Sequence, residues 1–182
     1  MTALNGIHPA SPAAPAAARG RYLHEVIRIL AGVALLTVSA RIALPAQPVP
    51  ITAQTLAVML VGALLGSRRG ALAVLAFLGA GAVGLPVFAY GGGVHYFFGP
   101  TAGYLVGFVP AAFVIGSLVE RGWGRRGLTA LAVLLIGDAI IFAFGLTWMA
   151  MWFPDKFAWL IFMPGEMLKI AIAAVVLTRL RR

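Results

Sequence analysis

The sequence contains no cysteine and few charged residues. Charged side chains make up only 10% of its 182 residues, whereas an average soluble domain has about 25%. Without cysteine the chain has no disulfide framework, no thiolate nucleophile and no thiolate metal site. Hydrophobic residues make up 62% of the chain. This composition indicates a single membrane domain and excludes a soluble enzyme that carries a short anchor.

The sequence also lacks the common motifs of nucleotide hydrolysis and of hydrolase chemistry. There is no GxxxxGK[ST] loop, so the chain does not hydrolyse ATP by that route. There is no GxSxG, no HExxH and no Cys/His cluster to supply a nucleophile or a metal-ligand set. His95 has no second ligand at metal-binding spacing. We therefore expect no enzyme activity and no resident cofactor.

The chain contains many long apolar runs. A membrane-spanning helix needs about 20 mostly apolar residues. Six segments meet or approach this requirement, at 26–44, 51–66, 70–89, 101–119, 127–150 and 157–178. Short loops join them, which makes successive helices antiparallel neighbours. The sequence thus predicts an all-α bundle of six transmembrane helices, surrounded by membrane lipid.

The net charge of +9 has an uneven distribution along the chain. Its arginines lie in short clusters between the apolar segments, which argues against a nucleic-acid partner. With six spans, four clusters fall on one side, and the excess of basic residues predicts that this side, with both termini, is cytoplasmic. These clusters comprise Arg19, Arg21, Arg28, Arg68, Arg69, Arg121, Arg125, Arg126, Arg179, Arg181 and Arg182.

The Ala- and Pro-rich start of the chain has no apolar core of the kind found in a signal peptide. We interpret residues 1–22 as a disordered cytoplasmic tail. Residues 23–182 then form the six-helix transmembrane domain, which binds the substrate.

The last apolar segment contains MPGEMLK at 163–169, with an acid and a base where only apolar residues are expected. Glu166 and Lys169 are three residues apart and would share one face of a helix. A helix over 157–178 would place them near the middle of the membrane. Ionisable residues at that depth normally face a protein interior or a water-filled cavity. We favour a substrate-binding pair, and a structural pair that bridges helices is the alternative.

Further candidate residues lie at the start of the second segment and inside the fifth. Gln54 can donate and accept hydrogen bonds, so Thr52 and Gln54 could contact a ligand. Their alternative role is helix capping by Thr52 with an interfacial Gln54. Asp138 lies in the middle of 127–150. It is either a hydrogen-bond partner between helices or a pocket residue.

The loop at 84–104 is rich in glycine and aromatic residues. Tyr90, Gly91 and Gly92 are candidates for closing over a ligand, because glycine permits close approach of the backbone. The alternative is an aromatic belt followed by a simple turn. Tyr104 and Phe97 could supply an apolar wall, although ordinary packing explains each of them alone.

Several motifs, taken together and in order, are similar to one known family. They are PVPITAQTLAVMLVGALLGSRRG at 48–70, GLPVFAYGGG at 84–93, GPTAGYLVGFVPAAFVIG at 99–116 and PGEMLK at 164–169. The chain resembles the BioY family, the biotin-specific substrate-binding subunits (S components) of energy-coupling factor (ECF) transporters. The family more often has Asp where this chain has Glu166, which keeps the charge and reaches one methylene further.

The resemblance implies a multi-pass protein of the bacterial inner membrane that binds biotin from outside. It also implies a transmembrane coupling protein and two cytoplasmic ATPases as partners. Glu166 and Lys169 would then contact the ureido ring of biotin, or Lys169 would instead contact its carboxylate.

Two other functions stay open at this point. One is an S component for another small vitamin. The other is an intramembrane enzyme that uses Glu166, Lys169 and Asp138 as acid and base. The sequence also leaves open whether the chain works alone, as a homo-oligomer or only with the ATPases.

Overall fold

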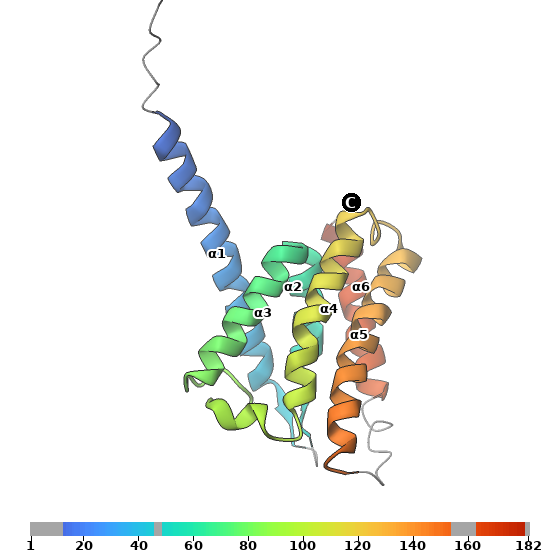
Figure 1. Cartoon of the computed structure of the whole chain (residues 1–182). Helices are drawn as coiled ribbons and strands as arrows, with labels where there is room; N and C mark the ends of the chain where they lie inside the picture. The colour runs from blue at the N-terminus through green and yellow to red at the C-terminus, as the bar shows by residue number, and fades with distance from the viewer. Residues whose placement is uncertain (1–12, 46–48, 154–162, 181–182) are drawn as a thin grey trace, which may run out of the picture.

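The fold is an all-helical bundle. A computed structural model describes residues 13–45, 49–153 and 163–180 (Figure 1). Within these ranges it contains six α-helices, which confirms the predicted fold class. They are α1 (Ala13–Arg41), α2 (Gln54–Leu65), α3 (Ser67–Ala82), α4 (Ala102–Glu120), α5 (Gly127–Ala150) and α6 (Met163–Leu180).

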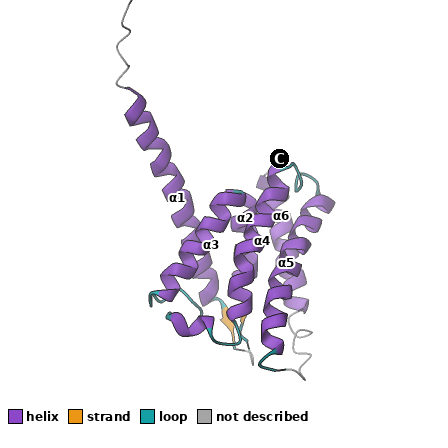
Figure 2. Cartoon of the chain, in the orientation of Figure 1, coloured by secondary structure: helices purple, strands orange, loops and turns teal. Residues whose placement is uncertain are grey.

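Short irregular elements connect the helices at one end of the bundle. Strands β1 (Ala43–Leu44) and β2 (Ile51–Thr52) pair antiparallel between α1 and α2 (Figure 2). A 3₁₀-helix, η1 (Val94–Phe97), lies in the connection from α3 to α4. The β1–β2 pair brings the segment before α2 against the bundle, and this segment becomes part of the site.

The observed helices differ from the predicted segments mainly at their ends. The third segment was expected to reach residue 89, but α3 ends at Ala82. Gly84 follows with a φ of 96°, a left-handed conformation that terminates helices. Residues 51 and 52 form β2 and do not belong to α2. Helix α1 begins at Ala13, inside the expected tail, and the division into tail and domain stays a prediction.

Helix length varies within the bundle. In the described part of the chain, three helices are long and apolar enough to cross a membrane, at Arg19–Arg41, Ala102–Glu120 and Gly127–Ala150. Helix α2 has only 12 residues, which is short of the about 20 that a full span requires. The second segment, at 51–66 the shortest of the six predicted, therefore contains a helix that is shorter still.

The two ends of the bundle differ in charge and in structure. The α2–α3 turn, the α4–α5 loop and the end of α6 lie together at one end (Figure 1). The arginines of the α3 start, of the α4–α5 loop and of the last turn of α6 therefore share that end, as the topology predicts. The β1–β2 pair and the start of α4 lie at the opposite end. Which end faces the cytoplasm stays a prediction.

Helix α4 occupies the centre of the bundle, where it packs against α2, α3 and α5. Its contact with the α2–α3 turn is close because Gly116 has no side chain. A Cβ atom on Gly116 would lie 2.3 Å from the backbone nitrogen of Ser67. Neither backbone can move without shifting a whole helix. Gly116 thus fixes the approach of α4 to the start of α3.

We predict that Gly116→Ala destabilises the folded protein by about 1–3 kcal/mol, the usual cost of overpacking. Gly79→Ala is the matched control, because a Cβ atom on this exposed glycine of α3 would meet nothing within 4 Å. It should leave stability unchanged or raise it slightly, since alanine favours helix. Thermal unfolding in detergent measures both variants, and equal midpoints would contradict the prediction.

Candidate functional site

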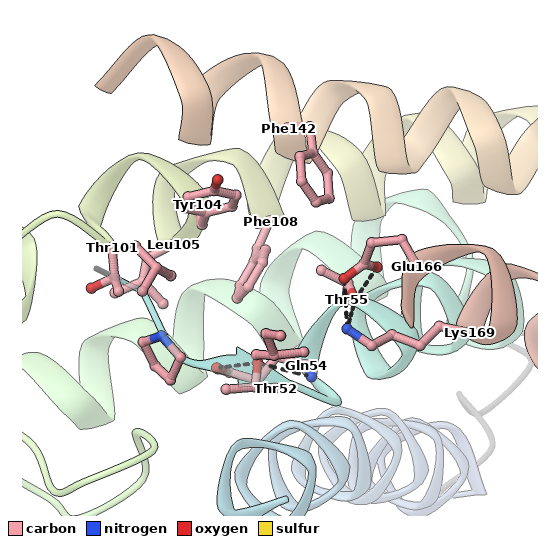
Figure 3. Close-up of a pocket in the computed structure, with 13 residues that line it drawn as sticks. Thr52, Gln54, Thr55, Thr101, Tyr104, Leu105, Phe108, Phe142, Glu166 and Lys169 are labelled. Carbon is pink, nitrogen blue, oxygen red and sulfur yellow. Dashed lines mark hydrogen bonds and ion pairs between the residues drawn. The ribbon is translucent and has the colours of Figure 1, made fainter. Parts of the chain in front are cut away.

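A cavity lies at the end of the bundle that carries the β1–β2 pair. Residues from four helices and from the segment before α2 converge on it (Figure 3). One side is polar and carries an acid, a base and hydroxyl groups, and the remainder is apolar and aromatic. The lining residues are Val49, Pro50, Ile51, Thr52, Gln54, Thr55, Thr101, Tyr104, Leu105, Phe108, Phe142, Glu166 and Lys169.

A buried ion pair forms the polar end of the cavity. Lys169 Nζ lies 2.6 Å from Glu166 Oε1. The hydroxyl of Thr55 on α2 donates to Glu166 Oε2 at 2.7 Å and accepts from Lys169 Nζ at 3.1 Å. The side chains of Glu166 and Lys169 are only 2% and 13% exposed. Three side chains thus form a closed hydrogen-bonded triangle that joins α2 to α6 (Figure 3).

The residues around the pair suit the first described turn of α6. Pro164 lies directly after Met163, in the first turn, where the missing N–H of proline costs nothing. Glu166 is in the same first turn, and its negative charge there is favourable to the helix dipole. The expected depth needs a helix over 157–162, which lies outside the described residues. The predicted membrane depth of Glu166 and Lys169 therefore stays a prediction.

Thr52 and Gln54 meet at the start of α2. The hydroxyl of Thr52 accepts from the Gln54 backbone N–H at 3.3 Å and donates to Gln54 Oε1 at 3.2 Å. The second contact uses the amide oxygen of Gln54. The buried Nε2 atom of the same side chain has no hydrogen-bond partner among the described residues. The N-cap of α2 is Ala53, with no side-chain cap hydrogen bond, so Thr52 does not cap the helix as the alternative had it. Thr52 instead orients Gln54, and both residues line the cavity.

Aromatic residues of α4 and α5 form the apolar wall. The rings of Tyr104 and Phe142 meet edge to face, with centroids 5.7 Å apart. A Cβ atom on Gly145 would lie 2.3 Å from the Tyr104 ring, so this glycine lets the ring pack against α5. The buried Tyr104 hydroxyl finds no partner in the described ranges. Tyr104 therefore combines the expected packing role with an unused polar group that lines the cavity.

Asp138 is buried beside the ion pair and does not line the cavity. Asp138 belongs to α5 and is only 6% exposed. Its carboxyl group lies close enough to Glu166 and Lys169 to interact with their charges. Its Oδ1 atom has no hydrogen-bond partner within the described residues. The structure thus places Asp138 near the ion pair but outside the cavity lining, and its role stays a prediction.

The part of the glycine-rich loop that contains Tyr90, Gly91 and Gly92 does not line the cavity. Tyr90 is 65% exposed, and neither it nor Gly91 or Gly92 belongs to the cavity lining. Phe88 anchors the loop, because it is 1% exposed and its ring contacts Phe77, Tyr96 and Phe97. Phe97 therefore belongs to this cluster and not to the cavity wall. That Tyr90, Gly91 and Gly92 close over a ligand stays a prediction.

Comparison with known proteins bears on what this cavity holds. A sequence profile of the BioY family matches residues 11–182. The chain belongs to the BioY family. It is 45% identical to a biotin transporter BioY of Rhizobium etli, over 70% of this chain and 75% of that protein. It is 38% identical to a biotin transporter BioY of Thermotoga maritima, over 88% of this chain and 97% of that protein.

A solved structure has the same fold. It is described as the S-component for biotin from an ECF-type ABC transporter, and it superposes with a TM-score of 0.82. The two chains are 26% identical, and the match covers 89% of this chain and 93% of the other. This BioY-family chain is therefore a multi-pass membrane protein of a transporter family and not an enzyme. The intramembrane acid–base enzyme is set aside.

Several lining residues of the BioY-family cavity were not predicted from the sequence. Thr55, Phe108 and Phe142 belong to this group. Thr55 lies next to Gln54, but nothing local relates it to Glu166, which is 111 residues further along the chain. Phe108 and Phe142 occur in apolar helices where any phenylalanine is an ordinary packing residue. No group of three or more His, Asp or Glu side chains that could hold a metal occurs in the described ranges.

We predict that Lys169→Met strongly destabilises the protein, because it leaves the Glu166 carboxylate buried without its cation. Breaking a buried pair in this way costs about 3–5 kcal/mol. The double variant Glu166→Gln with Lys169→Met removes both charges and should recover most of this loss. Thermal unfolding in detergent without ligand tests the pair. A double variant no more stable than the single one would contradict the prediction.

Proposed function

We propose that this protein binds biotin from the outer side of the membrane and mediates its uptake as the substrate-specific subunit of an ECF transporter. The observation that carries the proposal is the cavity itself. It places a buried acid–base pair at one end of an aromatic wall. The names of the relatives, which are biotin transporters, support biotin as the ligand.

The polar groups of the cavity match the polar groups of biotin. The ureido ring of biotin has two N–H donors and one carbonyl acceptor. Glu166 can accept from the N–H groups, and Lys169 can donate to the carbonyl oxygen. Both residues are held by Thr55, so their orientation does not depend on the ligand. Preorganised groups of this kind lower the entropy cost of binding.

Two further groups have an unused donor beside the cavity. Gln54 Nε2 and the Tyr104 hydroxyl are buried without a partner among the described residues. A buried donor that lacks a partner costs about 1–3 kcal/mol, and a ligand acceptor would remove that cost. The carboxylate of biotin is a suitable acceptor for either donor. In the alternative assignment, this carboxylate binds Lys169.

The aromatic wall suits the apolar part of biotin, its thioether ring and its aliphatic chain. Tyr104, Phe108 and Phe142 line this side (Figure 3). The cavity is narrow, about 60 Å³, whereas pockets that hold drug-sized ligands measure about 300–1,000 Å³. Side chains or connecting segments around the cavity must therefore move when biotin enters.

The direction of transport follows from the positions of the charges. The arginine clusters lie at the end of the bundle opposite to the cavity, and such clusters are retained on the cytoplasmic side. The cavity end then faces outward in the bacterial inner membrane, with both termini in the cytoplasm. Because the sequence has no ATP-binding loop, we assign the energy-dependent step to a transmembrane coupling protein and two cytoplasmic ATPases.

We expect Glu166→Ala and Lys169→Ala each to weaken biotin binding by at least tenfold. Truncating one partner of a buried, hydrogen-bonded charge pair costs about 2–5 kcal/mol. Arg69→Ala is the matched control, because Arg69 forms an ion pair with Glu25 that is partly exposed and away from the cavity. Titration calorimetry on variants that purify as folded protein measures the effect. Unchanged affinity in both cavity variants would contradict the assignment of the site.

A second experiment separates biotin from other vitamins on the same scaffold. Ligand that co-purifies with the protein is released and identified by mass spectrometry. We expect the ligand to be biotin. Recovery of a different vitamin would contradict the assignment of biotin but not the location of the binding site.

The transport assignment has its own test. Biotin uptake is measured in cells that lack their own biotin transport, with and without the coupling protein and ATPases. We expect energised uptake only when these partners are present. Equal uptake by the chain alone would contradict the role assigned to the ATPases.

A further inference from the structure

One cation at the cavity end of the bundle does not belong to the cavity lining. Arg41 is the last residue of α1, it precedes the β1–β2 pair, and its side chain is exposed (Figure 1). Basic residues gather on the cytoplasmic side of membrane proteins. Arg41 lies instead at the end that the proposed topology places outside, so the topology does not explain its charge.

Backbone hydrogen bonds place Arg41 next to a segment that lines the cavity. The residue after it, Ile42, accepts from the backbone N–H of Ala53 at 3.0 Å. Ala43 then pairs with Thr52 in the β1–β2 ladder, and Thr52 lines the cavity. Only one residue of chain therefore separates Arg41 from the backbone that pairs with the cavity segment.

The side chain of Arg41 contacts the other connection at this end of the bundle. Its Nη2 atom donates to the backbone carbonyl of Pro86, which belongs to the glycine-rich loop at 84–104. Arg41 thus joins this loop to the end of α1. A guanidinium group has several N–H donors, and the contact with Pro86 leaves others available for a second acceptor.

The positive charge of Arg41 is not balanced by an acid in the described part of the chain. The acidic residues of that part are Glu25, Glu120, Asp138 and Glu166. None of these four forms an ion pair with Arg41. The Pro86 carbonyl is a neutral acceptor, so it fixes the guanidinium group without cancelling its charge. An exposed positive charge therefore lies beside the cavity segment.

The ligand of the proposed function is an anion. Biotin ends in a carboxylate, and a guanidinium group pairs with a carboxylate through charge-assisted hydrogen bonds. We propose that Arg41 is an entrance site that captures the carboxylate of the approaching ligand. Arg41 does not line the cavity, so this contact belongs to the approach of the ligand and not to the final complex. The inference rests on the proposed function and adds a residue that favours anionic ligands.

Such an entrance site acts on the rate of association. A charge at the rim of a binding site typically changes the association rate and its dependence on salt. Charges interact over about 30 Å at 0.01 M salt and over about 3 Å at 1 M. The attraction between Arg41 and biotin is therefore strong only at low salt. The dissociation rate depends on the final complex, and Arg41 leaves it unchanged.

Stopped-flow mixing of biotin with the purified protein in a neutral detergent measures the association rate. We expect Arg41→Gln to associate about two- to threefold more slowly than the unaltered protein at about 0.01 M salt, and equally fast at about 1 M. Glutamine keeps an N–H donor for Pro86 and loses only the charge. Arg41→Glu reverses the charge and should associate more slowly still.

Arg28→Gln is the matched control. It removes the same charge from an exposed position of the same helix, about 20 Å nearer the opposite end. We expect its association rate to equal that of the unaltered protein at both salt concentrations. Equal slowing by Arg28→Gln and Arg41→Gln would overturn the entrance site, because the effect would then come from the total charge of the protein.

Biotinamide separates the capture of an anion from a structural role of Arg41, because a neutral amide replaces its carboxylate. We expect biotinamide to associate equally fast with the unaltered protein and with Arg41→Gln. If Arg41→Gln slows biotin and biotinamide alike, a displaced loop explains the loss and the proposal is overturned. Unchanged association of biotin in both Arg41 variants at low salt also overturns it. Loss of bound anionic lipid from these variants would then make Arg41 a lipid contact.

The entrance site and the proposed binding site fail in different ways. If Glu166→Ala and Lys169→Ala weaken biotin binding while Arg41→Gln associates normally, the entrance site is wrong and the binding site stands. If both cavity variants bind biotin normally while Arg41→Gln slows its association only at low salt, the assignment of the cavity is wrong and capture at Arg41 stands.

Discussion

The buried pair of Glu166 and Lys169 is the interaction on which the site depends. A charge inside a membrane protein is tolerated only when it is paired and hydrogen-bonded. The Thr55 hydroxyl meets this condition, because it donates to Glu166 and accepts from Lys169. The start of α2 and the start of α6 are thereby held together. The polar end of the cavity takes its geometry from this junction.

Close helix packing supports the junction from the opposite end of the bundle. Gly116 brings the backbone of α4 against Ser67, and Glu120 at the end of α4 accepts hydrogen bonds from the backbone N–H and the hydroxyl of Ser67 at 2.8 Å each. Both contacts fix α4 relative to the turn that follows α2. The helix that supplies Tyr104 and Phe108 is therefore rigidly placed relative to the helix that supplies Thr55. A narrow cavity with converging polar groups needs this precision.

Much of the architecture follows from the sequence, and the reasons are local. Apolar runs between arginine clusters predict six helices and the end at which the arginines gather. Glu166 and Lys169 could be recognised because charged residues are conspicuous in an apolar segment and share a helix face. The boundary between β2 and α2 and the early end of α3 were harder to predict, because apolar residues continue through both points. Tyr90 and its glycines attracted attention by composition alone, and the structure places them away from the cavity.

The sequence by itself determined the class of the molecule, the number of its helices and the presence of an acid–base pair in the last of them, since each depends on residue type and spacing along the chain. Only the tertiary structure decided which side chains meet. Thr55 joins Glu166 to Lys169, and Gln54 and Tyr104 bring to the cavity donors that have no partner among the described residues. These relations join residues of different helices, and their distances depend on how the helices pack. Packing of this kind has no signature in the spacing of residues along one segment.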